Sequence, residues 1–162
     1  MAIFKSFSGI ITAIDDQWNG HGGGVGCIKL MTVKNMDGSI VNFVVTPATY
    51  FVDYVMVSVG NTVTGFYDAN AATPLIFPPQ FEAIIMARVE QNQNVKVDYF
   101  NWQMVSSDGT LKLNISSFTQ MLLANGQAFT ANPAERILIV IYGATTRSIP
   151  AQTTPYKIIV LC

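Results

Sequence analysis

Two segments of this chain, about 70 residues apart, share one pattern, and this repeat restricts the possible folds more than any other feature. "DGSIVNFVVTPATYFV" covers residues 37–52, and "DGTLKLNISSFTQMLL" covers residues 108–123. With one residue gapped, the segments align at three apolar positions and one threonine: Val41, Phe43, Val45 and Thr49 with Leu111, Leu113, Ile115 and Thr119. The alternating apolar positions are typical of strands that bury one face.

A second pair of segments aligns further along the chain. "GFYDANAATPLIFPPQFEAIIMA" matches "VIYGATTRSIPAQTTPYKIIVLC" in the order Tyr67 with Tyr142, Pro78 with Pro150, Gln80 with Gln152, and Ile84 and Ile85 with Ile158 and Ile159. The polar stretch "EQNQN" lies between the halves and is typical of a linker. We therefore predict an internal duplication, with one β domain at residues 1–90 and a second at residues 95–162.

Strand signals dominate both halves, and no segment has the long 3.6-residue apolar period of a substantial helix. The Asp-Gly pairs at residues 37–38 and 108–109 are favoured hairpin turns. Residues 47–61 are ambiguous and fit a short helical turn followed by an extended stretch. The predicted strands cover residues 8–14, 27–33, 40–46, 62–68 and 82–89 in the first half, and 95–100, 111–115, 136–143 and 156–162 in the second.

This order predicts an all-β fold of two tandem five-stranded OB-like Greek-key barrels. In each half a hairpin joins the second and third strands, and a longer irregular link precedes the fourth, as in small barrels of the OB type. The segment "VSVGNTVTGFYD" also resembles the stretch that leads into the fourth strand of OB-fold proteins.

The pattern resembles tandem-barrel proteins of spore-forming anaerobic bacteria, and a β module of their surface proteins. In that module a tyrosine-bearing strand leads to a Thr-x-Ser-x-Pro-x-Gln segment and a final apolar strand. The matching residues here are Thr146, Ser148, Pro150 and Gln152, whereas the first half departs from the motif with Pro74, Ile76, Pro78 and Gln80. The resemblance covers most of the chain and implies an architecture without an assigned activity.

Charged residues make up 12% of the chain, against about 25% in typical soluble domains. Nine basic and ten acidic residues give a net charge of −1, which argues against a basic face for nucleic acid. A near-neutral, charge-poor surface favours association. The composition therefore predicts that the partner is a second copy of the chain, in a homo-oligomer or a larger assembly.

The sequence contains no apolar run of ~18 residues, so we expect no membrane span. Its start, "MAIFKSFSGIITAIDD", lacks the basic segment, long apolar core and cleavage site of a secretory signal. We expect synthesis in the cytoplasm without a signal peptide, with deposition on a spore or cell surface as a further route.

Two cysteines, Cys27 and Cys162, are open to two interpretations. Either both are small buried hydrophobes at strand positions, or they form a disulfide within or between chains, and the terminal position of Cys162 favours an intermolecular one. Two cysteines and one histidine do not make a zinc site, and no metal or other cofactor is predicted.

Catalytic motifs are not supported by their context. The glycine-rich "NGHGGGVG" at residues 19–26 leads into a strand, whereas a phosphate-binding loop needs a Lys-Ser/Thr pair that opens a helix. We predict a hairpin tip with a solvated His21. Asp15 and Asp16 are adjacent in a strand and point to opposite faces, so they do not form an acid–base pair. The prediction is a protein that is not an enzyme.

The apolar stretch "TPLIFPPQFEAIIMA" contains three prolines, which exclude a helix. Its counterpart in the second half is "RSIPAQTTPY". Both are expected to be stiff crossings before the last strand, whose apolar residues cap a barrel end or contact a neighbouring subunit. The predicted interaction residues are Leu75, Ile76, Phe77, Pro78, Pro79, Gln80, Arg147, Ile149, Pro150 and Gln152.

The leading hypothesis is a structural or interaction protein that self-associates through charge-poor surfaces, into a higher-order assembly or a spore-surface layer. The alternative is an OB-type module that binds carbohydrate or oligonucleotide through aromatic residues on one face. The aromatic candidates are Trp18, Trp102, Tyr50, Phe51, Tyr54, Tyr67, Phe77, Phe81, Tyr99 and Phe100. Core positions account for many of these, and an oligonucleotide also needs a positive track, which is thin in this chain.

Overall fold

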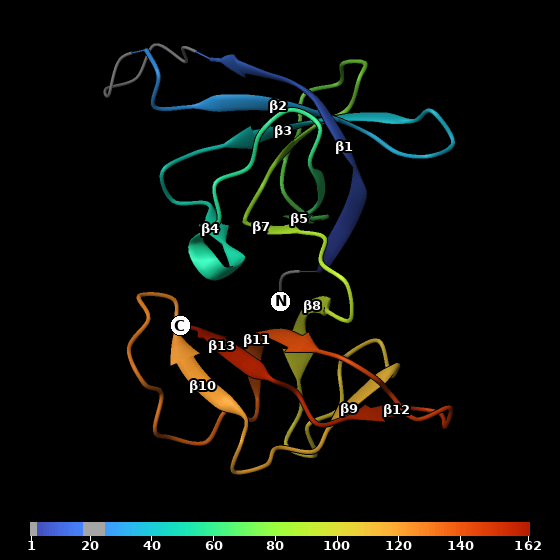
Figure 1. Ribbon diagram of the computed structural model, residues 1–162, viewed down its shortest axis with the longest axis vertical. Helices are drawn as coiled ribbons and strands as arrows, with labels where there is room; N and C mark the ends of the chain where they lie inside the picture. Colours follow the sequence, from blue (N-terminus) through green and yellow to red (C-terminus); the bar gives the residue numbers. More distant parts are fainter. Residues whose placement is uncertain (1–2, 18–24) are drawn as a thin grey trace. The chain divides into compact units, whose positions relative to one another are not determined.

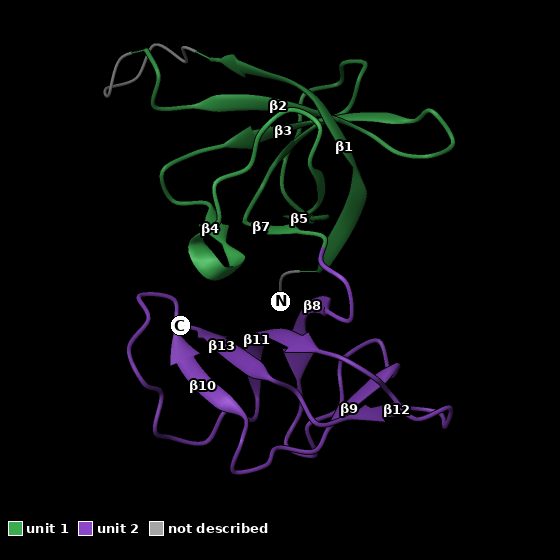
Figure 2. Ribbon diagram, viewed as in Figure 1, with its two compact units in different colours: residues 1–89 green, residues 90–162 purple. Residues whose placement is uncertain are grey.

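The computed structural model describes residues 3–17 and 25–162 as strands and turns, with one short 3₁₀ turn at Val52–Tyr54. No α-helix occurs in these two ranges, and the all-β class is confirmed. Trp18, His21 and most of the glycine-rich segment lie outside the described residues. The chain divides into two compact units, Met1–Val89 and Glu90–Cys162 (Figure 2).

The first unit contains one seven-stranded sheet, in the order β4-β7-β5-β1-β2-β3-β6 (Figure 1). Its strands are β1 (Phe4–Asp16), β2 (Lys29–Lys34), β3 (Ile40–Val45), β4 (Tyr50–Phe51), β5 (Thr62–Asp68), β6 (Gln80–Glu82) and β7 (Ile85–Arg88). The predicted strand at residues 62–68 has the observed bounds. The short β4 was not predicted, because the segment 47–61 gave no clear strand pattern.

The long strand β1 serves two neighbours in succession. Its first half pairs with β5 and its second half with β2, both antiparallel, and the register shifts between Ile11 and Ala13. Such a bulge bends a strand and increases its twist. Gly9 allows the close approach to β2, because a Cβ at this position would lie 2.3 Å from the carbonyl oxygen of Lys34. β1 extends beyond both ends of the predicted strand at residues 8–14.

The β2–β3 hairpin forms at the Asp-Gly pair, as the sequence predicted. Gly38 has a φ of +92°, a conformation that glycine adopts without the steric cost of a Cβ. The Oδ1 atom of Asn35 accepts hydrogen bonds from the backbone N–H groups of Asp37 (3.2 Å) and Ser39 (2.9 Å). Side-chain acceptance of this kind stabilises the turn locally.

The predicted strand at residues 82–89 is instead two short strands with different neighbours. β6 pairs in parallel with β3, and β7 pairs antiparallel with β5. Between them, the N–H of Ala83 donates to Val44 and the N–H of Ile84 donates to Phe66. Residues 80–88 therefore connect β3 with β5. An unbroken strand that pairs with only one of these neighbours cannot connect them.

The core of the first unit lies inside this arrangement, with Phe43 at its centre. Phe43 is fully buried, and its ring occupies the space beside Gly65, where a Cβ would lie 2.5 Å from the ring. Burying a phenylalanine side chain contributes roughly 1.5–3 kcal/mol. The other buried residues of this cluster are Ile11, Met31, Val33, Val41, Val45, Val57, Val63, Ala83 and Met86.

The second unit contains a four-stranded sheet, β10-β13-β11-β8, and a two-stranded sheet, β12-β9. Its strands are β8 (Asn94–Phe100), β9 (Leu111–Leu113), β10 (Gln120–Leu123), β11 (Arg136–Tyr142), β12 (Ala151–Thr153) and β13 (Lys157–Leu161). The sequence did not predict β10 and β12, which are short and pair in parallel with distant segments. Its core contains Phe100, Leu111, Leu113, Leu138, Val140, Ile158 and Val160.

The strand pairings of the two units correspond. The parallel pair β3–β6 corresponds to β9–β12, and the parallel pair β4–β7 corresponds to β10–β13. The antiparallel pair β5–β7 corresponds to β11–β13. The pairings correct one alignment: Ile84 donates its N–H to Phe66, as Tyr156 does to Ile141, so Ile84 corresponds to Tyr156 and not to Ile158.

One threonine in each unit makes the same pair of hydrogen bonds. The hydroxyl of Thr49 donates to the carbonyl of Ala83 (2.8 Å) and accepts from the N–H of Thr46 (3.0 Å). The hydroxyl of Thr119 donates to the carbonyl of Pro155 (2.8 Å) and accepts from the N–H of Ser116 (3.2 Å). Thr49 therefore links the turn before β4 to Ala83, which lies between β6 and β7. Thr119 likewise links the turn before β10 to Pro155, which lies between β12 and β13.

Replacing Thr49 or Thr119 with valine tests this link. Valine keeps the side-chain shape but leaves a half-buried N–H and a carbonyl without their partner, so each variant should lose about 1–3 kcal/mol of unfolding free energy. Urea denaturation measures the loss. Thr12→Val is the control, because the Thr12 hydroxyl is exposed and its bond to Thr32 is 3.4 Å long. Equal losses in all three variants would contradict the proposed link.

Candidate functional site

The proline-containing loop of the first unit exposes its apolar side chains. Leu75 is fully exposed, Phe77 is 87% exposed, and Ile76 is about half exposed. Pro78, Pro79 and Gln80 are partly buried, and the Phe77–Pro78 peptide bond is cis. The carbonyl of Pro79 accepts a hydrogen bond from the N–H of Asn42 (2.9 Å), which fixes the end of the loop to β3. These apolar side chains therefore do not cap the core of their own unit.

The corresponding loop of the second unit has the same character. Ile149 is 97% exposed, Arg147 is exposed, and Pro150 and Gln152 are partly buried. The Ile149–Pro150 bond is cis, like the Phe77–Pro78 bond of the first unit. In both units, an exposed apolar residue, Phe77 or Ile149, therefore directly precedes the cis proline that lies just before β6 or β12.

The Thr-x-Ser-x-Pro-x-Gln residues form a continuous chain of hydrogen bonds in this second loop. The N–H of Gln152 donates to the Thr146 hydroxyl (2.9 Å), which lies 2.6 Å from the Ser148 hydroxyl. The Ser148 hydroxyl donates to the carbonyl of Pro150 (2.9 Å), so the Thr146 hydroxyl must donate to Ser148. This series of hydrogen bonds stabilises the conformation of residues 146–152, in which the Ile149 side chain is exposed.

The predicted aromatic candidates do not share one character. Tyr67 and Phe81 stack with ring centroids 3.9 Å apart, and Phe100 is fully buried. Trp102 and Tyr54 are exposed on different units. Burial raises the pKa of Tyr50 to about 12, with smaller contributions from Tyr54 and Asp53, and the Tyr50 ring contacts that of Tyr54 edge-on. A single aromatic face for base stacking therefore does not emerge from the described residues.

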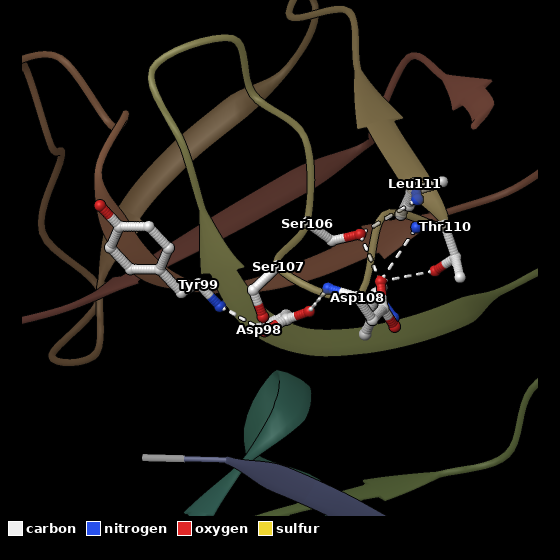
Figure 3. Close-up of polar contacts among 8 residues, drawn as sticks. Asp98, Tyr99, Ser106, Ser107, Asp108, Thr110 and Leu111 are labelled. Atoms are coloured by element: carbon white, nitrogen blue, oxygen red, sulfur yellow. Dashed lines mark hydrogen bonds and ion pairs between the residues drawn. The ribbon is translucent and has the colours of Figure 1, made fainter. Parts of the chain in front are cut away.

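A network of polar side chains that the sequence did not reveal surrounds the second Asp-Gly turn (Figure 3). Asp98 of β8 accepts hydrogen bonds from the backbone N–H of Tyr99 (2.7 Å), the hydroxyl of Ser107 (2.6 Å) and the backbone N–H of Asp108 (3.3 Å). Figure 3 shows Ser107 and the backbone N–H of Asp108 beside Asp98, and the Ser106 hydroxyl directed to Asp108 and Leu111. Ser106 is buried, and its hydroxyl also accepts from the N–H of Leu111 (3.0 Å).

Asp108 is the centre of the network. Its carboxylate accepts from the Nζ of Lys96 (2.6 Å), the hydroxyl of Ser106 (2.6 Å), and both the hydroxyl (2.8 Å) and the N–H (3.0 Å) of Thr110. Partial burial favours the neutral carboxylic acid, but these hydrogen bonds favour the carboxylate more strongly. The pKa of Asp108 therefore lies well below its ordinary value.

The carboxylates of Asp98 and Asp108 both accept hydrogen bonds from residues of this turn. Asp16 is likewise paired, with Lys29. Within residues 3–17 and 25–162, no group of three or more His, Cys, Asp or Glu side chains could hold a metal ion. The hydrogen bonds of Asp98 and Asp108 stabilise the turn, and those of Asp108 also involve Lys96 and Thr110.

Cys27 and Cys162 are both exposed, so the interpretation of buried strand residues is wrong for both. Exposure is compatible with the predicted intermolecular disulfide, which stays a prediction.

Comparisons of the chain with protein-family models, with curated proteins and with solved structures gave no match. The resemblance to tandem-barrel proteins of spore-forming anaerobes stays a prediction. Among the residues that the structure describes, no helix has both the length and the apolar character needed to cross a membrane.

Replacing Asp108 with asparagine tests the network. At pH 7 the variant should lose roughly 4–8 °C of Tm, the shift that ~1 kcal/mol produces in a domain of this size. The folded-state pKa of Asp108 is lowered from 3.8, so its contribution to stability is complete above that pH and is lost as the pH falls through the folded pKa. The difference in Tm between variant and wild type should therefore narrow below pH 3.8.

Circular dichroism melts in a series of acidic and neutral buffers give both curves. Asp37→Asn is the matched control, because Asp37 occupies the first Asp-Gly turn and its carboxylate interacts only with the nearby Ser39 and Asn35, without a lysine. Its effect should be clearly smaller. Parallel curves for Asp108→Asn and wild type at every pH would show that the Asp108 charge does not stabilise the fold.

Proposed function

We propose that this chain is a non-enzymatic structural protein that self-associates through its two proline-containing loops. The observation that carries the proposal is the exposure of large apolar side chains at the same place in both units: Leu75 and Phe77 in the first, and Ile149 in the second. Leu75, Ile76 and Phe77 are adjacent in the chain and all exposed, and grouped apolar side chains at the surface mark interaction sites in soluble proteins.

The low charge of the chain supports the same proposal. Charged residues make up only 12% of the sequence, so electrostatic repulsion between copies is weak. Burying one large apolar side chain contributes roughly 1.5–3 kcal/mol, so several such residues together offset part of the free-energy cost of association. The hydrogen-bonded loop of residues 146–152 holds Ile149 outward before binding, which reduces the entropy lost on association.

The hypothesis of a non-enzymatic role is supported by the state of the acidic side chains. The carboxylates of Asp98 and Asp108 accept hydrogen bonds within a turn, and Asp16 pairs with Lys29. These side chains serve the fold. We propose that the self-association extends to a higher-order assembly, such as a surface layer.

We further propose that each unit is a five-stranded OB-like barrel, and that the two arose by duplication. When β6 and β7 are taken as one interrupted strand, this strand pairs with β3 at one end and with β5 at the other. β3 pairs with β2, β2 with β1, and β1 with β5, so the series of pairings returns to its start. A parallel pairing of the third and last strands is the expected OB arrangement. The matching pairings and the matching Thr49 and Thr119 bonds support the duplication.

Light scattering of Phe77→Asp and Ile149→Asp tests the self-association. The wild type should form oligomers at micromolar concentration. Each substitution should raise the apparent Kd at least ~10-fold, because it places a charge in an apolar contact. Because both side chains are exposed in the chain, their Tm should change by less than about 2 °C.

Met36→Asp is the matched control, since Met36 is also fully exposed but lies outside both loops. It should leave the oligomers intact. A wild type that stays monomeric over a wide concentration range would exclude the proposal. An equal loss of oligomers in Met36→Asp would show that the two loops have no special part in association.

A further inference from the structure

An open, uncharged pocket of about 440 Å³ lies in the second unit, where the chain leaves β11 and passes through β12 into β13. Three segments line it: Asn114 after β9, residues 143–146 after β11, and the stretch from Gln152 to Tyr156. All of these residues are described and belong to one unit. The volume lies within the roughly 300–1,000 Å³ of small-molecule sites.

The lining of this pocket selects for an uncharged, hydrogen-bonding ligand. None of its lining residues is Lys, Arg, His, Asp or Glu. Arg and Lys are the strong hydrogen-bond partners of phosphate and carboxylate ligands, and an oligonucleotide needs a positive track along its backbone. The side chains that are present offer hydroxyl and amide groups, namely Asn114, Thr145, Thr146, Gln152, Thr154 and Tyr156.

Two amide side chains form a fixed pair at the pocket. The Nδ2 of Asn114 donates to the Oε1 of Gln152 at 3.1 Å. This bond leaves the Oδ1 of Asn114 as an acceptor and the Nε2 of Gln152 as a donor, and neither has a partner among the described residues. An acceptor beside a donor complements two neighbouring hydroxyl groups, one of which donates while the other accepts.

An aromatic ring completes the lining. Tyr156 is 54% exposed, so part of its ring is accessible. Its hydroxyl lies against the backbone of Gly143, where a Cβ would be only 2.1 Å away. Gly143 therefore permits the observed position of the ring. A half-exposed ring beside polar groups suits a ligand that has both apolar C–H surface and hydroxyl groups.

The first unit does not have these groups at the corresponding positions. β9 pairs with β12 as β3 pairs with β6, which places Val44 at the position of Asn114. The matching backbone bonds place Ile84 at the position of Tyr156. Only the glutamine is common to both units, as Gln80 and Gln152. The pocket is therefore a particular property of the second unit and does not follow from the shared pairing of strands.

From this arrangement we infer that the pocket of the second unit binds a neutral sugar ring. The hydroxyl groups of the sugar bond the Asn114–Gln152 amide pair, and a C–H face of the ring packs against Tyr156. The pocket shares Thr146 and Gln152 with the loop of residues 146–152, but the exposed Ile149 side chain is not part of its lining. Ile149→Asp therefore tests self-association and Tyr156→Ala tests sugar binding, so either proposal can fail without the other.

Saturation-transfer NMR with the full chain tests the site, because the method detects ligands with millimolar Kd, and ligand titrations followed by protein-observed NMR supplement it if the chain is monomeric. The probes are neutral hexoses, pentoses, N-acetylhexosamines and neutral disaccharides, with glucuronic acid and a short single-stranded DNA as charged comparisons. At least one neutral sugar should bind with a Kd of ~1 mM or tighter. The charged probes should give no comparable signal.

Three variants localise the binding. Tyr156→Ala and Gln152→Ala should each weaken it ~10-fold, because they remove the ring and the unpaired donor. Gly143→Ala should also weaken it, since the added Cβ displaces the Tyr156 hydroxyl. Ile84→Ala, at the corresponding position of the first unit, should leave the affinity unchanged. Thermal melts check that each variant is folded, and Gly143→Ala keeps every pocket side chain if Tyr156→Ala is unstable.

The inference fails if no neutral sugar gives saturation transfer at about 50 mM, far above a millimolar Kd. It fails equally if a sugar binds but folded Tyr156→Ala, Gln152→Ala and Gly143→Ala retain the wild-type affinity. Preference for glucuronic acid or DNA over neutral sugars would also overturn it, because the lining has no charge to explain such a preference.

Discussion

In each unit, the last stretch of chain pairs with two different neighbours, and the rest of the unit depends on this double pairing. In the first unit, Ala83 donates its N–H to Val44 and the next residue, Ile84, donates to Phe66. The two acceptors belong to β3 and β5, which are far apart in the order of the sheet. The same pairing encloses Phe43 and brings its ring against Gly65.

This double pairing also explains the proline-containing loops. A strand that runs parallel to β3 must begin at the same end of the unit as β3, so the chain crosses over after β5 before it can pair. The crossing has few backbone partners, and proline, which lacks an N–H, leaves no donor unsatisfied there. The carbonyl of Pro79 is then bonded by Asn42 as soon as the pairing begins.

Local signals in the sequence predicted much of the fold. Asp37-Gly38 identified a hairpin, because the turn depends on residues that are adjacent in the chain. The strand at residues 62–68 was predicted with its observed bounds. The strands β10 and β12 were missed, since each is short and is defined by a parallel partner more than thirty residues away. The split of residues 82–89 was missed because it depends on which neighbour each N–H reaches.

Among the candidate sites, too, those made of adjacent residues were found from the sequence, and those made by strand pairing were not. The alignment of Pro78 with Pro150 located both exposed loops, because the motif is contiguous in each half. Neither the Asp98–Asp108 network nor the Asn114–Gln152 pair is contiguous, and strand pairing brings their members together. Sequence alone also left open whether Phe77 is buried, since an apolar residue beside proline suits a core as well as a contact surface.

The occurrence of one exposed apolar loop in each unit has a consequence for the size of any assembly. A subunit with a single contact surface forms a closed pair, and growth stops there. This chain has two such loops, one carrying Phe77 and the other Ile149, on separate units. If both loops engage, each subunit is divalent. Divalent subunits join into open chains or rings, and a variant with one blocked loop becomes a chain terminator that shortens the polymers of the normal protein.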